Sequence, residues 1–284
     1  MVKTYAERIN LTCDYIDEHL SESLSIEQLC AVAHFSKTHF KRQFFEFTGI
    51  TVYKYIQLLR LKRASYQLVF HDTSKIIDIA MEANFDNPES FSRAFKNAFG
   101  QTPSQFRKAP RWKPWSERYQ FSKRESIKTM NVEITHFKET KVAMLQHRAA
   151  PELLNDSVSH FIEWRKNSEL SPLATSNTYG IAYDDPETTE AKDFRFDICG
   201  SVKADVPTNS QGVITGCIPQ GRCAKMRHMG SHDVMGDAVR YLYAQWLPES
   251  GEELRDFPCF FHYLNLFPEV AEHELVTDIY LPLV

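Results

Sequence analysis

Two segments in the first third of the chain repeat each other, and this duplication limits the folds that the region can adopt. Shifted by 50 or 51 residues, positions of the first copy recur in the second. The pairs are Ala33 and Ala83, Phe35 and Phe85, Phe40 and Phe91, Arg42 and Arg93, Phe44 and Phe95, Gly49 and Gly100, and Thr51 and Thr102. Matches at this many equivalent positions indicate one structural unit used twice.

The first copy has the pattern of two short helices joined by a tight turn. Ser25 begins a capping box, and Ser36 can cap a second helix over residues 37–47 that Gly49 ends. Between the helices stands His34, one of the residue types that tolerate a positive φ. The pattern therefore predicts a helix-turn-helix.

A long helix is expected to join the two copies. Residues 52–70 are rich in Leu, Arg and Lys and contain neither Gly nor Pro. In the second copy, Ser74 is expected to cap the first helix, and Asn84 suits a left-handed turn. A stiff spacer fits a protein whose recognition helices enter successive major-groove segments, about 34 Å apart on B-DNA.

Polar stripes on the outer faces of the two second helices are the candidate DNA-binding residues. They comprise Lys37, Thr38, Lys41 and Arg42 in the first copy, and Asn87, Glu89, Ser90, Ser92 and Arg93 in the second. Arginine can bond guanine O6 and N7 together, and glutamate can accept from cytosine N4. The alternative is that both stripes are ordinary solvated helix faces.

The duplicated region resembles the DNA-binding domain of the AraC/XylS family. The second copy carries the sharpest match, in Ile79-Ala80, Asn84-Phe85, residues 90–96, residues 99–104 and Phe106-Arg107. The resemblance implies that one chain contacts two successive major-groove segments with the stripes named above. His34 and Asn84 replace the commoner turn glycine, and Pro88 enters the second recognition helix.

Charge is distributed unevenly along the chain. Residues 1–128 carry 20 Lys and Arg against 14 Asp and Glu, whereas residues 129–284 carry 13 against 23. A basic part joined to an acidic part predicts an anionic partner for the first and another partner for the second. With the predicted helix-turn-helix units, the expected anionic partner is double-stranded DNA. Residues 109–128 contain Trp112 and Trp115 without a helical or alternating pattern, which predicts a basic linker after a DNA-binding domain over 1–108.

The cysteines and the N-terminus indicate the cellular compartment that we expect for the protein. None of the six cysteines lies in a C-x-x-C pair, so they are expected to be buried free thiols. The first residues lack the apolar core of a signal peptide, and no segment is long and apolar enough to span a bilayer. We expect a cytoplasmic protein without a membrane partner.

A second repeat, with a constant offset of 81, organises residues 129–284. Ala143, His147, Asp156, Val158, Asp197 and Ile198 recur as Ala224, His228, Asp237, Val239, Asp278 and Ile279. Short apolar runs near 132–134, 142–145, 179–183 and 194–202 predict strands, and residues 152–167 predict a helix with Phe161 and Trp164 inward. The expected fold is α+β, with two pseudo-symmetric halves packed side by side.

This region resembles the GyrI-like effector-binding domain. The resemblance lies in residues 179–187, Trp246-Leu247-Pro248, Phe257-Pro258-Cys259-Phe260 with Tyr263-Leu264-Asn265, and residues 278–282. It implies a groove for amphiphilic small molecules, with Trp164, Tyr179, Tyr183, Phe261 and Tyr263 as candidate lining residues. Phe261 stands where many members carry Glu, which favours a neutral or weakly charged hydrophobic ligand because a carboxylate is the usual partner of an organic cation.

Together these features predict a multi-domain, sequence-specific transcriptional regulator, with an all-α tandem helix-turn-helix domain followed by a ligand-sensing α+β domain. RNA polymerase is an expected partner. The alternatives for the second domain are a protein-interaction module and a small-molecule hydrolase, although the chain as a whole is expected not to be an enzyme. No cofactor and no metal site are expected, since His228 and His232 lack the H-E-x-x-H pattern.

Overall fold

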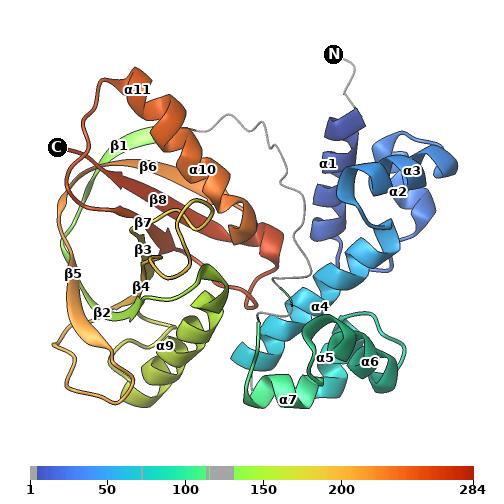
Figure 1. Ribbon diagram of the computed structural model, residues 1–284, viewed down its shortest axis with the longest axis horizontal. Coiled ribbons are helices and arrows are strands. Elements are labelled where there is room, and N and C mark those ends of the chain that lie inside the picture. Colours follow the sequence, from blue (N-terminus) through green and yellow to red (C-terminus); the bar gives the residue numbers. More distant parts are fainter. Residues whose placement is uncertain (1–4, 72, 113–114, 116–130) are drawn as a thin grey trace. The chain divides into compact units, whose positions relative to one another are not determined.

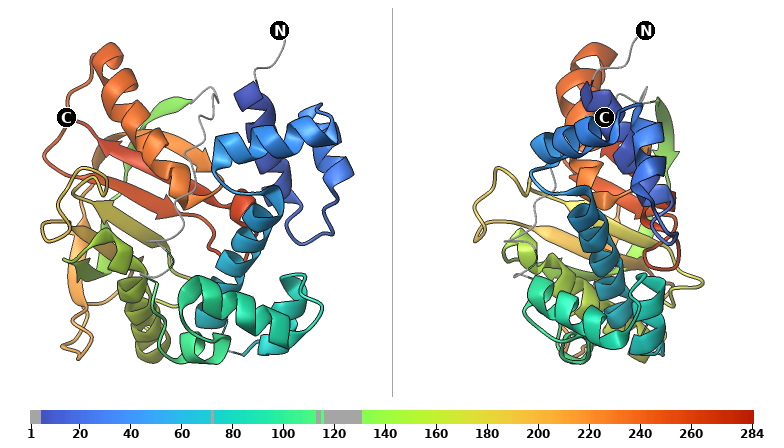
Figure 2. Two further views of the ribbon diagram at one scale, coloured as in Figure 1. Left: turned by 45° about the vertical axis from the view of Figure 1, so that its right-hand side comes forward. Right: turned by 90° about the vertical axis from the view of Figure 1, so that its right-hand side faces the viewer.

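The computed structural model describes residues 5–71, 73–112, 115 and 131–284. They form two compact units, one made of helices and the other of a β-sheet with its helices (Figure 1; Figure 2). The all-α domain followed by an α+β domain that the sequence predicts is therefore confirmed. Among the described residues, no helix is both long and apolar enough to cross a membrane.

The N-terminal unit consists of two helix groups joined by the rod α4 (Figure 1). Its helices are α1 (Tyr5–Glu18), α2 (Ile26–Ala33), α3 (Lys37–Thr48), α4 (Val52–Phe70), α5 (Ile76–Glu82), α6 (Pro88–Phe99) and α7 (Pro103–Lys108). The sequence placed α4 at these same bounds. The predicted recognition helices are α3 in the first copy and α6 in the second.

Local side-chain bonds set the helix ends. Ser25 completes its capping box with Gln28, and the Ser36 hydroxyl accepts from the backbone N–H of His39. His34 and Asn84 both adopt a left-handed backbone, with φ of 51° and 57°. The prediction for Ser74 is wrong, because α5 begins one residue later, after Lys75, and the Ser74 carbonyl instead accepts a bond from Arg107.

Each helix group has its own aromatic core. Phe40 and Phe44 are fully buried in the first, and Phe91, Phe95 and Phe99 in the second. These rings occupy the inner faces of α3 and α6, so the polar residues between them must face outward.

The second core extends beyond residue 108, so part of the predicted linker is wrong. Trp112 and Trp115 are only 4% and 8% exposed, and the Trp115 ring stacks on Phe99 with centroids 4.7 Å apart. Their large apolar surfaces are better placed on the Phe-rich core than in water. Residues 113–114 and 116–128 of the predicted linker lie outside the described part of the chain.

The C-terminal unit is a single antiparallel sheet with helices on one face. Its strands are β1 (Val132–Phe137), β2 (Thr140–His147), β3 (Thr178–Ala182), β4 (Phe196–Ser201), β5 (Ile214–Ile218), β6 (Gly221–Met229), β7 (Cys259–Tyr263) and β8 (Val276–Pro282). Its helices are η1 (Pro151–Leu153), α9 (Leu154–Ser168), η2 (His232–Val234), α10 (Met235–Tyr241), the π-helical segment η3 (Leu242–Trp246), α11 (Leu247–Ser250) and η4 (Glu272–Glu274).

The strand order confirms the repeat and adds a feature that the sequence analysis did not predict. The order is β1-β6-β8-β7-β3-β4-β2-β5, so β3 and β7, which start 81 residues apart, pair at the centre. The first strand of each half pairs with the second strand of the other half, β1 with β6 and β5 with β2. The halves therefore share one sheet with exchanged outer strands rather than lying side by side as separate units.

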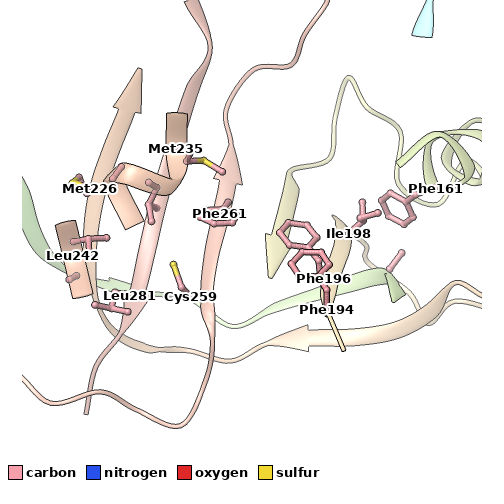
Figure 3. Packing of buried hydrophobic residues seen from close by; sticks show 14 of the residues in the cluster. Phe161, Phe194, Phe196, Ile198, Met226, Met235, Leu242, Cys259, Phe261 and Leu281 are labelled. Atoms are coloured by element: carbon pink, nitrogen blue, oxygen red, sulfur yellow. The ribbon is translucent and has the colours of Figure 1, made fainter. Parts of the chain in front are cut away.

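The two faces of the sheet bury different clusters. On one face, Phe161 and Trp164 of α9 and Met235, Ala238 and Leu242 of the α10 region pack against the strands. Figure 3 shows Phe261 in this cluster, between side chains of the first half and side chains of the second. The opposite face buries a cluster that includes Tyr179, Ile181, Cys199, Phe260 and Tyr280.

None of the six cysteines forms a disulfide bond, as predicted, but they are not all buried. Cys217 is exposed and Cys30 is half-buried, whereas Cys13, Cys199, Cys223 and Cys259 are buried. Cys217 lies on β5, an edge strand of the sheet, where alternate side chains face solvent.

Candidate nucleic-acid interface and ligand-binding face

The stripe on α3 is exposed as the sequence predicts. Lys37, Thr38, Lys41 and Arg42 all face solvent, opposite the buried Phe40 and Phe44. Lys37 also forms an ion pair with Glu27 of α2, Nζ to Oε1 2.9 Å, and this hydrogen bond lowers the pKa of the Glu27 carboxyl. Lys41 and Arg42 are therefore the stripe's main source of uncompensated positive charge.

The stripe on α6 divides into structural and outward-facing residues. The Asn87 side chain caps α6 by accepting from the Ser90 backbone N–H at 2.8 Å, and the Ser90 hydroxyl donates to the Asn87 carbonyl. Ser92 is half-buried, whereas Glu89 and Arg93 are exposed. The residues best placed to reach DNA from α6 are thus Glu89 and Arg93.

Phe45 extends the α3 stripe and was not among the sequence candidates. It lies three residues after Arg42 and four after Lys41, on the same side of the helix, and it is 49% exposed. The helical spacing from Lys41 could have identified it.

Hydrogen bonds fix the two helix groups to each other within the N-terminal unit. The Asn84 side-chain amide donates to the carbonyl oxygens of Ser21 and Glu22, at 3.1 Å each. From α4, Arg60 donates to the carbonyls of Leu20 and Glu22, and Arg63 donates to the Ser21 hydroxyl. These bonds, hereafter the clamp, connect the loop between α1 and α2 to the second helix-turn-helix and to α4.

A groove with a volume of about 500 Å³ lies between α4 and α6. Tyr53, Lys54, Gln57 and Arg60 contribute to it from α4, and Arg93 contributes from α6. It therefore borders the face of α6 that carries the exposed Arg93.

The structure does not bring the five candidate ligand residues together. Trp164, Phe261 and Tyr263 belong to the cluster on the helix-covered face of the sheet. Tyr179 lies on the opposite face, stacked on His262 with ring centroids 4.6 Å apart. Because alternate residues of a strand point to opposite faces, Tyr179 of β3 cannot join Phe261 of β7.

Tyr183 occupies a third position, where it bonds a buried carboxylate. Its hydroxyl donates to Asp197 Oδ2 at 2.9 Å, and Arg148 pairs with Asp197 Oδ1 at 2.7 Å. Burial, together with the bond to Asp197, raises the pKa of Tyr183 to about 12. Asp278, 81 residues after Asp197, is held in a similar way by Arg227 at 2.7 and 2.9 Å. These arrangements neutralise two buried carboxylates.

At the centre of the helix-covered face, a glycine makes room for aromatic rings. Gly180 pairs with Phe261 across β3 and β7. A Cβ at Gly180 would lie 2.5 Å from the Phe196 ring and 2.8 Å from the Tyr263 hydroxyl. Gly180 therefore allows Phe196 and Tyr263 to approach each other beside Phe261.

His147 and His228, which occupy equivalent positions in the two halves of the C-terminal domain, both bond backbone carbonyls. Nε2 of His147 is 3.1 Å from the Ala150 carbonyl, and Nε2 of His228 is 3.0 Å from the Ser231 carbonyl. In the described part of the chain, no group of three or more His, Cys, Asp or Glu side chains could hold a metal ion.

Comparison with known proteins finds a family model that matches each unit. A family model described as a GyrI-like small molecule binding domain matches residues 130–284, and one described as a helix-turn-helix domain matches residues 29–109. The chain is 50% identical over 155 residues to the probable transcriptional regulator YgiV of Escherichia coli K12, which covers 55% of this chain and 97% of that protein. It is 37% identical over 98 residues to the right origin-binding protein of the same organism, 34% of either chain.

Among solved structures, the chain is similar to EcmrR in the cryo-EM structure of an EcmrR–DNA complex, with 16% identity and a TM-score of 0.46 over 92% of this chain and 85% of that one. These two relatives are named as a probable transcriptional regulator and an origin-binding protein, not as enzymes. The chain belongs to the GyrI-like family and joins that domain to an N-terminal helix-turn-helix region.

Proposed function

We propose that one chain binds an asymmetric DNA site of about 20 base pairs, with α3 and α6 in successive major-groove segments. The observation that carries this proposal is the clamp, which holds two outward-facing recognition helices in one unit. A fixed separation lets both helices engage one duplex without paying the entropy of ordering them at binding.

The two recognition helices have unequal roles in this proposal. Thr38, Lys41 and Arg42 read bases or bind phosphates from α3, with Lys37 partly occupied by Glu27. Glu89 and Arg93 contact the second groove segment, and Ser92 assists from its half-buried position. Asn87 and Ser90 act mainly by fixing the start of α6, where backbone N–H groups can bind a phosphate.

Single substitutions of the two arginines test this assignment. Arg42→Ala or Arg93→Ala is expected to weaken binding to a site selected from random DNA by about 1–3 kcal/mol and to relax sequence preference in one half of it. Binding to unselected DNA should weaken much less. An equal loss on both DNAs would show that these arginines contact phosphates rather than bases.

For the C-terminal domain, the proposed role is sensing a small hydrophobic or amphiphilic ligand at the helix-covered face, between the halves. Support comes from the family description of this domain and from the aromatic side chains around Gly180 and Phe261. Tyr263 is half-buried there, so its hydroxyl can orient a ligand that accepts a hydrogen bond. With Phe261 in place of a carboxylate, a neutral ligand suits the apolar surroundings better than a cation.

A thermal-shift screen with neutral and cationic amphiphiles tests the sensing role. A ligand present at 100 times its Kd stabilises the folded domain by about 2.7 kcal/mol. Stabilisation by neutral compounds that Tyr263→Phe weakens would support the proposal. If neither class raises the unfolding temperature, a protein-interaction role is favoured. Contact with RNA polymerase stays a prediction from the sequence.

A further inference from the structure

The groove between α4 and α6 is lined mainly by polar and charged side chains. Three basic residues border it, Lys54 and Arg60 of α4 and Arg93 of α6, against one acidic residue, Asp86. The exposed ring of Tyr53 and the amide of Gln57 complete the α4 side. This excess of positive charge favours an anionic occupant.

Within the described residues, no carboxylate forms an ion pair with any of the three cations. Lys54 Nζ donates to the neutral Gln57 side chain at 3.2 Å. Arg60 donates Nε and Nη2 to backbone carbonyls, and burial lowers the pKa of its guanidinium. Lys54 and Arg93 are therefore available to an external anion, whereas Arg60 is held by the clamp.

The position of the groove identifies that anion. A chain that inserts α3 and α6 into successive major-groove segments must cross the sugar–phosphate backbone between them. The helix that spans this interval is α4, and the groove lies between α4 and the second recognition helix. We infer that the groove seats the DNA backbone between the two half-sites, with Lys54 binding a phosphate and Tyr53 and Gln57 bordering it. This inference rests on the proposed function.

In this arrangement α4 is a third DNA-binding element as well as a spacer. Its contacts are to phosphates, so they add affinity without direct base recognition. Asp86 opposes the same phosphate, which gives the groove one residue whose removal should strengthen binding. Stronger binding after removal of Asp86 would not result from general damage to the protein, because damage weakens binding.

The test uses the full chain and measures binding to a selected site and to unselected DNA over a range of salt concentrations. Lys54→Ala should weaken binding to both DNAs by the same factor. It should also reduce the slope of log K against log salt by about 0.9, the value for one phosphate contact on B-DNA. Asp86→Asn should strengthen binding to both DNAs. Lys138→Ala, which makes the same charge change on the β1–β2 turn, should leave binding unchanged.

A matched change in the DNA identifies the phosphate directly. Methylphosphonate linkages, which lack the negative charge, are placed one at a time between the half-sites. One of them should weaken binding by the wild-type protein and have no further effect on Lys54→Ala. Lys54→Arg should retain sensitivity to that linkage. Unchanged thermal unfolding of each variant, measured in parallel, verifies its fold.

Two failures of this experiment can be told apart. If the wild-type chain selects no site from random DNA, the proposed function fails. If it selects a site but Lys54→Ala behaves like Lys138→Ala, or no linkage between the half-sites matters, the proposed function stands and the groove inference is overturned.

Discussion

Asn84 donates its side-chain amide to the backbone carbonyl of Ser21 at 3.1 Å, across 63 residues of sequence. The same residue holds the left-handed turn of the second helix-turn-helix, with φ of 57°. Glycine would satisfy only the requirement of the turn for a positive φ. Asparagine adds a bond to the loop of the first helix-turn-helix, so one side chain couples a local turn to the separation of the two DNA-binding units.

Asn84→Gly should uncouple these roles. Because glycine adopts the turn without strain, the fold should be kept while the bonds to the loop are lost. We expect weaker binding to the complete site and unchanged binding to an isolated half-site, measured by titration of labelled duplexes. The variant should also tolerate one inserted base pair between half-sites better than the wild type does. Equal losses on complete and half-sites would contradict the coupling role.

Trp112 should contribute strongly to the stability of the N-terminal unit. Its ring packs against Phe106 at 5.0 Å between centroids, and Trp112→Ala should destabilise the unit by about 3–5 kcal/mol in denaturant unfolding. Trp112→Phe is the matched control. The indole Nε1 is buried without a hydrogen-bond partner among the described residues, so phenylalanine removes an unpaired donor while keeping most of the apolar contact. A negligible effect of Trp112→Ala would refute the extended core.

Phe261→Glu should convert the helix-covered face into a site for a hydrophobic cation. Phe261 is buried among apolar residues, so burial should raise the pKa of the new carboxyl. A raised folded-state pKa gives a variant that is most stable at low pH and loses stability as pH rises through that pKa. At neutral pH an aromatic quaternary ammonium ion should raise its unfolding temperature, but not that of Phe261→Gln. Equal responses of Glu and Gln variants would contradict this prediction.

His262 should make the C-terminal domain sensitive to mild acid. Burial lowers its pKa, although Asp278 opposes this effect while Lys225 and Arg227 reinforce it. The unfolded chain then binds the proton at higher pH than the folded chain, so stability should fall as pH decreases below about 6.5. His262→Gln should flatten this dependence in thermal unfolding between pH 7.5 and 5. His136→Gln, at an exposed position, should keep the wild-type slope.

Structural elements that depend on residues close together in the sequence could be predicted from the sequence. The rod α4, the left-handed turns at His34 and Asn84 and the capping box at Ser25 depend on neighbouring residues, and each is confirmed. The offset of 81 likewise predicted the pseudo-symmetric halves. Exposure of the α3 stripe followed from the helical positions of Phe40 and Phe44.

What the sequence missed depends on contacts between distant residues. Trp112 and Trp115 lack periodicity, and their burial is decided by Phe99 and Phe106. Tyr179 and Phe261 are both aromatic strand residues, but only the register of β3 against β7 places them on opposite faces. The bonds of Asn84 and Arg60 to the Ser21 loop could not be inferred from spacing, because they require the two helix groups to be packed.

The exchange of outer strands links the first strand of the C-terminal domain to its second half. The polypeptide enters this domain through β1, whose hydrogen-bonded partner is β6 of the second half. A shift of β6 would therefore reach the entry strand directly, through the hydrogen bonds that join the two strands. Through this connection, the half that is most distant in sequence from the DNA-binding unit is only one strand removed from its point of attachment.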